Sequence, residues 1–393
     1  MKKIIKLLIL VKHIEGGTGT FVSQLLKLKK LDKNLAIEIL ILGKQKYRLF
    51  HNKKTRIRYF NGIDAYPEYY QLDLTTILLV LKELLWLRKV IQSIQPDIVL
   101  SIDTHCNLLA SVVKYYFFRN MRIIISTHNN ISAVTEKKLS SFLCLLLKKV
   151  GGFFFKKADY IVCVSKGVTR DFKLFFSLNK RMVIIPYGID MKQTISLSNK
   201  RLSKSDKTLF EDKYKKIVSI GRFEVQKDFD TLIQAFALVY QKNPLAHLYL
   251  IGDGYDKQRL MGLTKQLNIN NVVYFLGWKQ NIYPYLKHSD LFVLSSEYEG
   301  FGWVLLEAMS QGLPIISTNA PHGPAEVLDN GKYGILVPVG DEQKIAETIT
   351  KLLTKKKLYD YYRKMSFERV GFFSEEKMLK AYKKLLLKEV FSV

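Results

Sequence analysis

The chain has 393 residues, of which 48% are apolar, and it carries a formal net charge of +27. This length and composition can bury two cores of roughly 150 to 200 residues each. The three cysteines have neither pairwise nor metal-ligand spacing, which argues against a disulfide framework or a zinc site and favours a reducing cytosol.

The positive charge is concentrated in the first half. Residues 1–190 hold 32 Lys and Arg against 13 Asp and Glu, a net +19, and the remainder holds 30 against 22, a net +8. Such a field attracts polyanions in general, whether nucleic acid, acidic lipid or anionic glycan. A plain solvated lysine surface is the alternative.

The N-terminus, MKKIIKLLILVKHIEGG, is predicted to form a first buried strand. Its positive start resembles a signal peptide, but the apolar run is short, is broken by Lys6 and ends in charge instead of a small-residue cleavage site. Later apolar stretches are also interrupted by charges, and none reaches 18 apolar residues without interruption, so we expect no membrane-spanning segment.

Strand-like and helix-like runs alternate through residues 1–190, which is typical of a parallel sheet with helices on both faces. Apolar residues spaced at three and four predict helices between the strands, including one from Glu136 to Lys157. We predict a first Rossmann-like domain here. Its expected strands are IIKLLILV, AIEILIL, DIVLSI, RIIIST, YIVCVS and MVIIP.

Residues 191–216 are polar, rich in serine and lysine, and without a period, which predicts a linker followed by a short lead-in to the next strand. The alternation then restarts with KIVSIG, AHLYLIG, NVVYFLG, LFVLSS and PIIST, so residues 191–373 are predicted to form a second Rossmann-like domain. The predicted fold is therefore α/β with two doubly wound domains, whose strand edges are expected to face a ligand cleft. The last predicted helix, residues 374–393, is either a simple terminal helix or one that packs back onto the first domain. We favour the second alternative.

Two cations follow the first strand of the second domain. In IGRFEVQKDFD the strand ends at Gly221, and Arg222 and Lys227 can converge across the turn that follows. A forked guanidinium and a point ammonium suit a diphosphate; two solvated cations are the alternative. The acidic pair in residues 228–230 resembles a metal site, but it opens a helix, and Asp228 is better used as the N-cap.

Two glutamates flank a glycine loop in SSEYEGFGWVLLEAM, residues 295–309. The loop precedes a helix, so its backbone N–H groups suit an anionic oxygen. Glu299 is expected at the mouth of the loop and Glu307 about two turns inside the helix. They are expected to face roughly the same way, because eight residues turn by about 800°, which is about 80° past two full turns. Each is expected to be an ionised acceptor for vicinal hydroxyls; a chance spacing is the alternative.

Other loops give weaker signals. IGDG, ending at Gly254, and FLGW end strands in glycine, which lets a ligand approach the backbone, although such glycines are also ordinary turn residues. GGTGTFV opens a helix, and Gly17 and Gly19 match the start of a dinucleotide fingerprint. Val22 stands where the third glycine belongs, so we expect no dinucleotide cofactor.

His128 follows the strand in RIIISTHNN. A histidine at such an edge can bond a sugar hydroxyl or transfer a proton, whereas a lone histidine is more often a structural hydrogen-bonding group. His105, in SIDTH, carries the same two interpretations with less support.

Together, these motifs resemble the retaining glycosyltransferases of family 4, also called group 1, which have the GT-B architecture. GRFEVQKDF, IGDG, SSEYEGFGWVLLEAM, GLPIIST and GKYGILVPVGD carry the resemblance in the second half, and GGTGTF, THNN and ADYIVCVSKGV carry it more loosely in the first. The resemblance implies transfer of a hexose or N-acetylhexosamine from a nucleotide-sugar, with UDP favoured by family frequency, with retained configuration and without a metal or other cofactor.

The resemblance also assigns roles to individual residues. It implies that Arg222 and Lys227 hold the donor diphosphate, where fixed cations stabilise the leaving charge without a metal. Glu299 is implied to contact the transferred sugar, and His128 to approach the reacting carbon. These four form the implied catalytic set. The implied substrate-binding residues are Gly16 and Gly17 for the acceptor, Phe301 and Gly302 for the donor, and Glu307 for the ribose. Gly254 is a further substrate-binding candidate, because its loop lets a ligand approach the backbone.

The remaining expectations concern partners. APHGPAEVL, residues 320–328, resembles a subgroup that builds lipopolysaccharide, capsule and lipid-linked glycans, so a saccharide or lipid-linked acceptor is implied. The lysine-flanked helix 136–157 is a candidate for contact with an anionic membrane from the cytoplasm, and a core-facing helix is the alternative.

Rival functions are a GT-B nucleotide-sugar epimerase or hydrolase and, from charge alone, a nucleic-acid-binding protein. No recognition motif supports nucleic acid. Tyr187 departs from the asparagine of many relatives.

Overall fold

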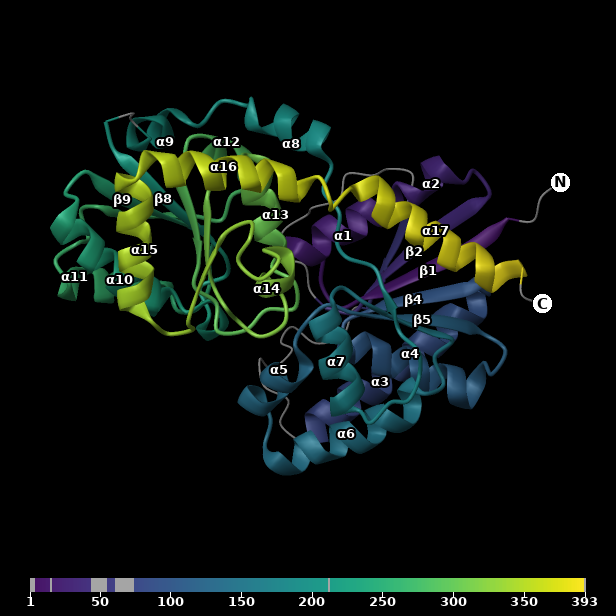
Figure 1. The fold of residues 1–393 in the computed structure, drawn as a ribbon. Coiled ribbons are helices and arrows are strands. Elements are labelled where there is room, and N and C mark those ends of the chain that lie inside the picture. The colour runs from purple at the N-terminus through teal and green to yellow at the C-terminus, as the bar shows by residue number, and fades with distance from the viewer. Residues whose placement is uncertain (1–3, 15, 44–54, 61–73, 211–212, 392–393) are drawn as a thin grey trace. The chain divides into compact units, whose positions relative to one another are not determined.

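The computed structural model describes residues 4–14, 16–43, 55–60, 74–210 and 213–391. The chain divides into two compact units (Figure 1). Unit 1 comprises residues 1–187 together with 375–393, and unit 2 comprises residues 188–374. Each unit is a parallel sheet with covering helices, so the α/β, doubly wound prediction is confirmed for both. No helix in the described ranges combines the length and the apolar character needed to cross a bilayer.

The described part of unit 1 contains a seven-stranded sheet in the order β3-β2-β1-β4-β5-β6-β7. Its central strands are almost entirely buried, as near-continuous apolar runs require when helices cover both faces. All six predicted strands are present. The edge strand β3, Arg56–Tyr59, was missed because RIRY alternates charge and remains largely accessible. The other strands are β1 Ile5–Val11, β2 Leu35–Ile41, β4 Ile98–Ile102, β5 Arg122–Thr127, β6 Tyr160–Cys163 and β7 Val183–Ile184.

One predicted helix of unit 1 is wrong. Instead of one helix over 136–157, the chain forms two helices separated at residues 139–140. Leu139 is extended, and the Ser140 hydroxyl accepts the N–H of Leu143 at 3.4 Å, which caps the second helix. The helices of unit 1 are α1 Gly16–Leu26, α2 Leu28–Leu31, α3 Leu74–Ile94, α4 Thr104–Phe117, α5 Ile131–Lys138, α6 Ser141–Phe155, α7 Lys166–Phe175 and α17 Glu375–Phe391.

The terminal helix α17 packs on α1 and α2 within unit 1. Lys27 forms a salt bridge with Glu375 at 2.8 Å, at the start of α17. Further along, Tyr382 is almost fully buried, and its ring lies 5.7 Å from that of Phe21 in α1. The chain therefore leaves unit 1 after Tyr187 and returns to it only at its end.

Unit 2 contains a six-stranded sheet in the order β10-β9-β8-β11-β12-β13 among the described residues. The five predicted strands are present, and the short strand β13 is added at the edge. Chain order reverses between β8 and β11, which is the switch point where doubly wound sheets bind ligands. The strands are β8 Lys215–Ile220, β9 Ala246–Ile251, β10 Val273–Gly277, β11 Leu291–Leu294, β12 Ile315–Thr318 and β13 Ile335–Val337.

The predicted linker at residues 191–216 is also wrong in part, because two short helices form there. Asp190 caps the first by accepting the N–H of Gln193 at 3.1 Å, and Ser203 caps the second by accepting the N–H of Asp206 at 3.1 Å. The helical segments of unit 2 are α8 Met191–Ser198, α9 Lys204–Leu209, η1 Val225–Lys227, α10 Phe229–Lys242, α11 Lys257–Gln266, α12 Tyr283–Lys287, α13 Trp303–Ser310, α14 Pro324–Val327, α15 Glu342–Thr354 and α16 Lys356–Val370.

Candidate active site

The loops that follow β8 and β11 meet at the switch point of unit 2, because those strands are hydrogen-bonded neighbours. Three hydrogen bonds join the loops. Glu297 donates its backbone N–H to the carbonyl of Gln226 at 2.9 Å, and the Gln226 amide donates to the carbonyl of Tyr298 at 3.0 Å. The Ser295 hydroxyl donates to the carbonyl of Lys227 at 2.8 Å. The backbone around Lys227 is therefore fixed from the neighbouring strand.

An ion pair completes this junction. The Lys227 ammonium donates to Oε1 of Glu299, and the Ser296 hydroxyl donates to the same oxygen at 2.8 Å. The side chains of Lys227 and Glu299 are only 17% and 8% exposed, so water screens the pair weakly. The structure thus brings together two residues predicted to act on different parts of one ligand.

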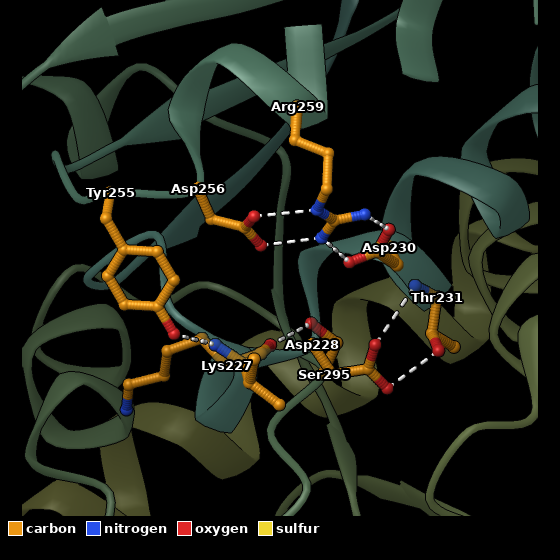
Figure 2. Close-up of polar contacts among 9 residues, drawn as sticks. Lys227, Asp228, Asp230, Thr231, Tyr255, Asp256, Arg259 and Ser295 are labelled. Atoms are coloured by element: carbon orange, nitrogen blue, oxygen red, sulfur yellow. Dashed lines mark hydrogen bonds and ion pairs between the residues drawn. The ribbon is translucent and has the colours of Figure 1, made fainter. Parts of the chain in front are cut away.

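The turn that presents Lys227 is set by the start of α10. Asp228 adopts the left-handed conformation with φ 45°, and its carboxylate accepts from the backbone N–H of Thr231 at 3.2 Å and from its hydroxyl at 2.7 Å (Figure 2). The predicted N-cap role of Asp228 is confirmed. Gly221 lies under the stem of Lys227, where an added Cβ would come within 3.2 Å of Cγ.

A second network braces the same turn from α11. Arg259 donates to both carboxylate oxygens of Asp230, at 2.6 and 2.5 Å, and to both of Asp256, at 2.6 Å each (Figure 2). The backbone N–H of Val225 donates to the Tyr255 hydroxyl at 3.4 Å. Asp228 and Asp230 are therefore each engaged by residues of unit 2.

Arg222 follows β8 but does not share the ion pair. Its guanidinium pairs with Glu224 at 2.8 Å, and its side chain is 70% exposed. The predicted convergence of Arg222 with Lys227 is therefore not the arrangement found in this structure. Its role toward a ligand stays a prediction.

The glycine loop before α13 has a defined backbone geometry. Gly302 caps the helix in the left-handed conformation with φ 85°, where glycine is favoured. The Phe301 side chain is buried and makes an edge contact with Phe373 at 5.6 Å. The backbone of Phe301 also packs closely on Gly323, where an added Cβ would lie 2.6 Å from its carbonyl carbon.

Glu307 lies just over one turn inside α13, not two turns as expected. The helix begins only at Trp303, after the left-handed Gly302, so the rotation argument that related Glu307 to Glu299 was wrong. Burial raises the pKa of Glu307 to about 8. The carboxyl is therefore mostly protonated at neutral pH, whereas the sequence argument expected an ionised group.

Gly254 has a packing reason of its own. An added Cβ would lie 2.3 Å from the carbonyl oxygen of Phe223. Two backbone hydrogen bonds accompany this close contact. The N–H of Phe223 donates to the carbonyl of Asp253 at 3.0 Å, and the N–H of Asp256 donates to the carbonyl of Phe223 at 3.2 Å. The glycine therefore joins the loops after β8 and β9, and its predicted contact with a ligand stays a prediction.

His128 belongs to unit 1, where both of its ring nitrogens have hydrogen-bond partners. Nε2 lies 2.9 Å from the Ser126 hydroxyl, and Nδ1 bonds the Tyr187 hydroxyl. Phe21 packs on the imidazole with ring centroids 4.8 Å apart. Burial lowers the pKa of His128 to about 3, so the ring is neutral at physiological pH. This geometry favours the structural alternative, and the catalytic role stays a prediction.

Gly16 and Gly17 form the first turn of α1, after β1. Gly16 has φ 52°, and an added Cβ at either position would meet no atom within 4 Å. Packing therefore does not explain these glycines, and their predicted place beside an acceptor stays a prediction.

Two family models match the chain. The model described as glycosyl transferases group 1 matches residues 200–369, and the model described as glycosyltransferase family 4 matches residues 44–193. The chain belongs to the family 4, group 1 glycosyltransferases. The first match contains both loops of the candidate site, including Lys227 and Glu299.

Relatives of this glycosyltransferase family member include proteins with curated names. An uncharacterised glycosyltransferase of Methanocaldococcus jannaschii is 33% identical over 59% of this chain and 64% of its own length. A lipopolysaccharide core biosynthesis glycosyltransferase of Rhizobium meliloti is 36% identical over 43% of this chain and 49% of its own. A Campylobacter jejuni 4-alpha-N-acetylgalactosaminyltransferase, whose name includes a diphospho-undecaprenol substrate, is 30% identical over 59% of this chain and 60% of its own length. The chain thus spans about half to two thirds of these relatives.

Solved structures show the GT-B fold over nearly the whole chain. The Anabaena protein HepE, crystallised with UDP and glucose, superposes with a TM-score of 0.76 at 17% identity, covering 98% of this chain and all of that one. Sucrose-phosphate synthase of Thermosynechococcus elongatus superposes with a TM-score of 0.80 at 19% identity, covering 99% of each chain. The predicted GT-B fold class is confirmed.

A polar cluster in unit 1 was not predicted. It lies after β1 and β4, the switch point of that sheet. His105 bonds the fully buried Glu83 at 2.8 Å. Asp103, with φ 75°, accepts the N–H groups of Cys106 at 3.0 Å and Lys12 at 3.2 Å. Burial lowers the pKa of Lys12, although Asp103, Cys106 and Glu83 oppose that shift. Glu83 lies within an apolar helical run, which gives no sign of a polar site. His105 was the only residue of this cluster that the sequence singled out as a possible site residue.

Proposed function

We propose that this protein is a retaining glycosyltransferase that moves a hexose or N-acetylhexosamine from a UDP-sugar to a saccharide or lipid-linked saccharide during synthesis of a cell-surface polysaccharide. The observation that carries the proposal is the shielded ion pair of Lys227 and Glu299 at the switch point of unit 2. A cation and an anion side by side complement a ligand that has a diphosphate at one end and sugar hydroxyls at the other.

The proposed chemistry follows from where charge develops. Cleavage of the sugar–phosphate bond places negative charge on the departing diphosphate, and a preorganised ammonium stabilises that charge best when water is excluded. Lys227 takes this part, and Arg222 adds a second cation by leaving Glu224. Glu299 accepts hydrogen bonds from the sugar, and Glu307 binds the ribose. Attack on the same face, with the leaving phosphate receiving the proton of the acceptor, gives retention of configuration.

The choice of donor and acceptor draws support from the relatives. HepE was crystallised with UDP and glucose, and two relatives are named for lipopolysaccharide core synthesis and for a diphospho-undecaprenol glycan. We extend a UDP-sugar donor and a surface-glycan acceptor to this chain as part of the proposal. We also propose that no metal is needed, because Lys227 and Arg222 supply positive charge at the diphosphate.

We further propose that the enzyme acts in the cytoplasm, at the inner face of the membrane. Its three cysteines, Cys106, Cys144 and Cys163, are all free and buried, which suits a reducing compartment. A lipid-linked acceptor would be held at the membrane surface, where the net +19 charge of residues 1–190 favours anionic headgroups.

A donor panel tests the proposal. Thermal shift and transfer are measured with UDP-, GDP- and ADP-sugars, with and without EDTA, on the wild type, Lys227→Ala and the surface control Lys265→Ala. We expect one nucleotide class to stabilise the wild type and the control but not Lys227→Ala, EDTA to have no effect, and NMR of the product to show the configuration of the donor. Full turnover by Lys227→Ala would reject the site, and nucleotide release without any acceptor would instead support the epimerase or hydrolase alternative.

A further inference from the structure

Three neighbouring helices of unit 1 carry a concentration of exposed apolar side chains. Helix α4 packs against both α3 and α6 (Figure 1). In the described residues 24 large hydrophobic side chains are exposed, and ten of them lie on these three helices. The most exposed on each helix are Leu85 at 54%, Tyr116 at 63% and Phe142 at 69%. Isolated apolar side chains are normal on a surface, but a cluster of this size indicates a partner.

Ring contacts make this surface continuous across the helices. The Arg88 guanidinium of α3 lies 4.5 Å from the ring centroid of Phe117 in α4. Between α4 and α6, the ring of Tyr115 lies 5.3 Å from that of Phe153, edge to face. We call the exposed residues of α3, α4 and α6 the three-helix face.

The charge of the three-helix face has one sign. The three helices contain six Lys and Arg, of which Lys82, Arg88, Lys89 and Lys149 are exposed, and a single carboxylate, Glu83, which is fully buried. The exposed Lys82 stands three residues before Leu85, so both lie on one side of α3. Likewise the exposed Lys149 stands four residues after Leu145 on α6. Cations therefore border the apolar side chains instead of lying on the opposite faces.

We propose that the three-helix face docks on the surface of an anionic lipid bilayer. Apolar side chains enter the boundary between headgroups and acyl chains while the bordering lysines meet lipid phosphates, which is how interfacial helices bind. This inference deepens the proposed membrane location and assigns it to three helices, in place of the single helix at 136–157. It uses no residue of the candidate active site, so its failure would leave the proposed reaction standing.

A second copy of the chain fits the three-helix face less well than a bilayer does. Two copies joined through this face would oppose lysine to lysine without an exposed carboxylate on α3, α4 or α6 to compensate, and like charges repel across an interface. An anionic bilayer satisfies the apolar area and the charge together.

Vesicle co-sedimentation of the full chain tests the inference. The probes are vesicles of phosphatidylcholine alone and of phosphatidylcholine with an equal amount of phosphatidylglycerol. We expect the wild type to bind the anionic vesicles and salt to weaken binding. The charge variant Lys82→Glu/Lys149→Glu and the apolar variant Phe142→Ser/Leu145→Ser are each expected to lower the partition coefficient by about tenfold or more.

Matched controls lie on unit 2. Lys356→Glu/Lys357→Glu makes the same change in net charge at exposed positions, and Ile195→Ser/Leu245→Ser removes two exposed apolar side chains. Both controls should bind as the wild type does, and circular dichroism verifies folding of every variant. The inference is overturned if the charge and apolar variants bind vesicles like their controls. It is equally overturned if light scattering shows a dimer that the Phe142→Ser/Leu145→Ser variant dissociates while the wild type ignores vesicles.

Discussion

Lys227 and Glu299 neutralise one another across the two loops of the switch point in unit 2. A diphosphate that binds the Lys227 ammonium competes with the carboxylate of Glu299 for that positive charge. The Ser296 hydroxyl still donates to Glu299 when the carboxylate leaves Lys227, but the buried charge then lacks its cation, and further hydrogen-bond donors offset that cost. Sugar hydroxyls supply such donors, and a free nucleoside diphosphate does not. The ion pair therefore favours the complete donor over the product UDP.

Glu299→Gln tests this exchange. Without the carboxylate, Lys227 is free to meet a diphosphate, so we expect tighter binding of UDP than in the wild type. Transfer should fall by about 10- to 100-fold, because a charge-assisted hydrogen bond to the sugar contributes about 1.5 to 3 kcal/mol. Calorimetric titration of UDP and steady-state kinetics measure both effects, with Glu347→Gln on the surface of α15 as control. Weaker UDP binding in Glu299→Gln would contradict the exchange.

Ser295→Ala tests whether the neighbouring strand positions Lys227. The variant removes the hydrogen bond to the Lys227 carbonyl without touching either charged group. A neutral hydrogen bond contributes about 1 kcal/mol, so we expect kcat/KM to fall about fivefold. Ser295→Thr keeps a hydroxyl and should recover most of that loss. An equal loss in both variants would indicate a packing defect and would contradict the positioning role.

Glu307 gives a pH-dependent signature of stability. Its pKa rises from an ordinary value near 4.5 to about 8 in the folded state, so the folded protein holds a proton that the unfolded chain has lost between those values. Stability therefore falls as pH rises through this window. Relative to Glu307→Gln, the wild type should lose on the order of 3 to 5 kcal/mol between about pH 5 and pH 8. Denaturation at a series of pH values measures the difference, and parallel profiles would contradict the shift.

The same carboxyl should make nucleotide binding depend on pH. If ribose hydroxyls donate to Glu307, binding favours its ionised form, and UDP affinity should rise as pH approaches about 8. Glu307→Gln has nothing to ionise at this position, so its profile shows the pH dependence that comes from the phosphates of UDP and the rest of the site. The wild type should show an additional rise in affinity, and parallel profiles of the two proteins would place the ribose elsewhere.

The strands of both sheets could be predicted from the sequence because buried parallel strands appear as short, nearly continuous apolar runs. Helix boundaries were harder, since single capping side chains decide them. Ser140 divides the predicted 136–157 helix, and Asp190 and Ser203 start helices in the predicted linker. These residues are visible in the sequence, but serine and aspartate are equally common in loops.

In the candidate site, too, the sequence identified individual residues better than it identified their partners. Lys227 and Glu299 stood out as charges beside glycine turns, yet their ion pair joins residues 72 apart in the chain. Spacing predicted that Arg222 would join Lys227, whereas Glu224, two residues away, holds it. The buried partner of His105, Glu83, lies 22 residues away, where an apolar helix hid it. Local patterns predict which strand edge carries a group, and tertiary packing decides its partner.

Two glycines of unit 2 should respond oppositely to the same substitution. Gly254→Ala places a Cβ 2.3 Å from the Phe223 carbonyl oxygen, and a backbone atom cannot move aside cheaply. Gly262 lies inside α11, where an added Cβ meets nothing within 4 Å. We expect Gly254→Ala to destabilise unit 2 by about 1 to 3 kcal/mol and Gly262→Ala to stabilise it by about 0.5 to 1 kcal/mol, because alanine is the better helix former. Urea denaturation followed by fluorescence measures the stability of each variant, and the same measurement with UDP-sugar present measures how much the donor still stabilises it.

Gly254 also holds the loop after β8 against the loop after β9. Gly254→Ala should therefore lose donor affinity in proportion to the distortion of these loops, whereas Gly262→Ala should keep the donor affinity of the wild type. Equal stability of the two variants would show that the loop after β8 tolerates displacement, and the position of Lys227 would then rest on the hydrogen bonds and the ion pair that join it to the loop after β11.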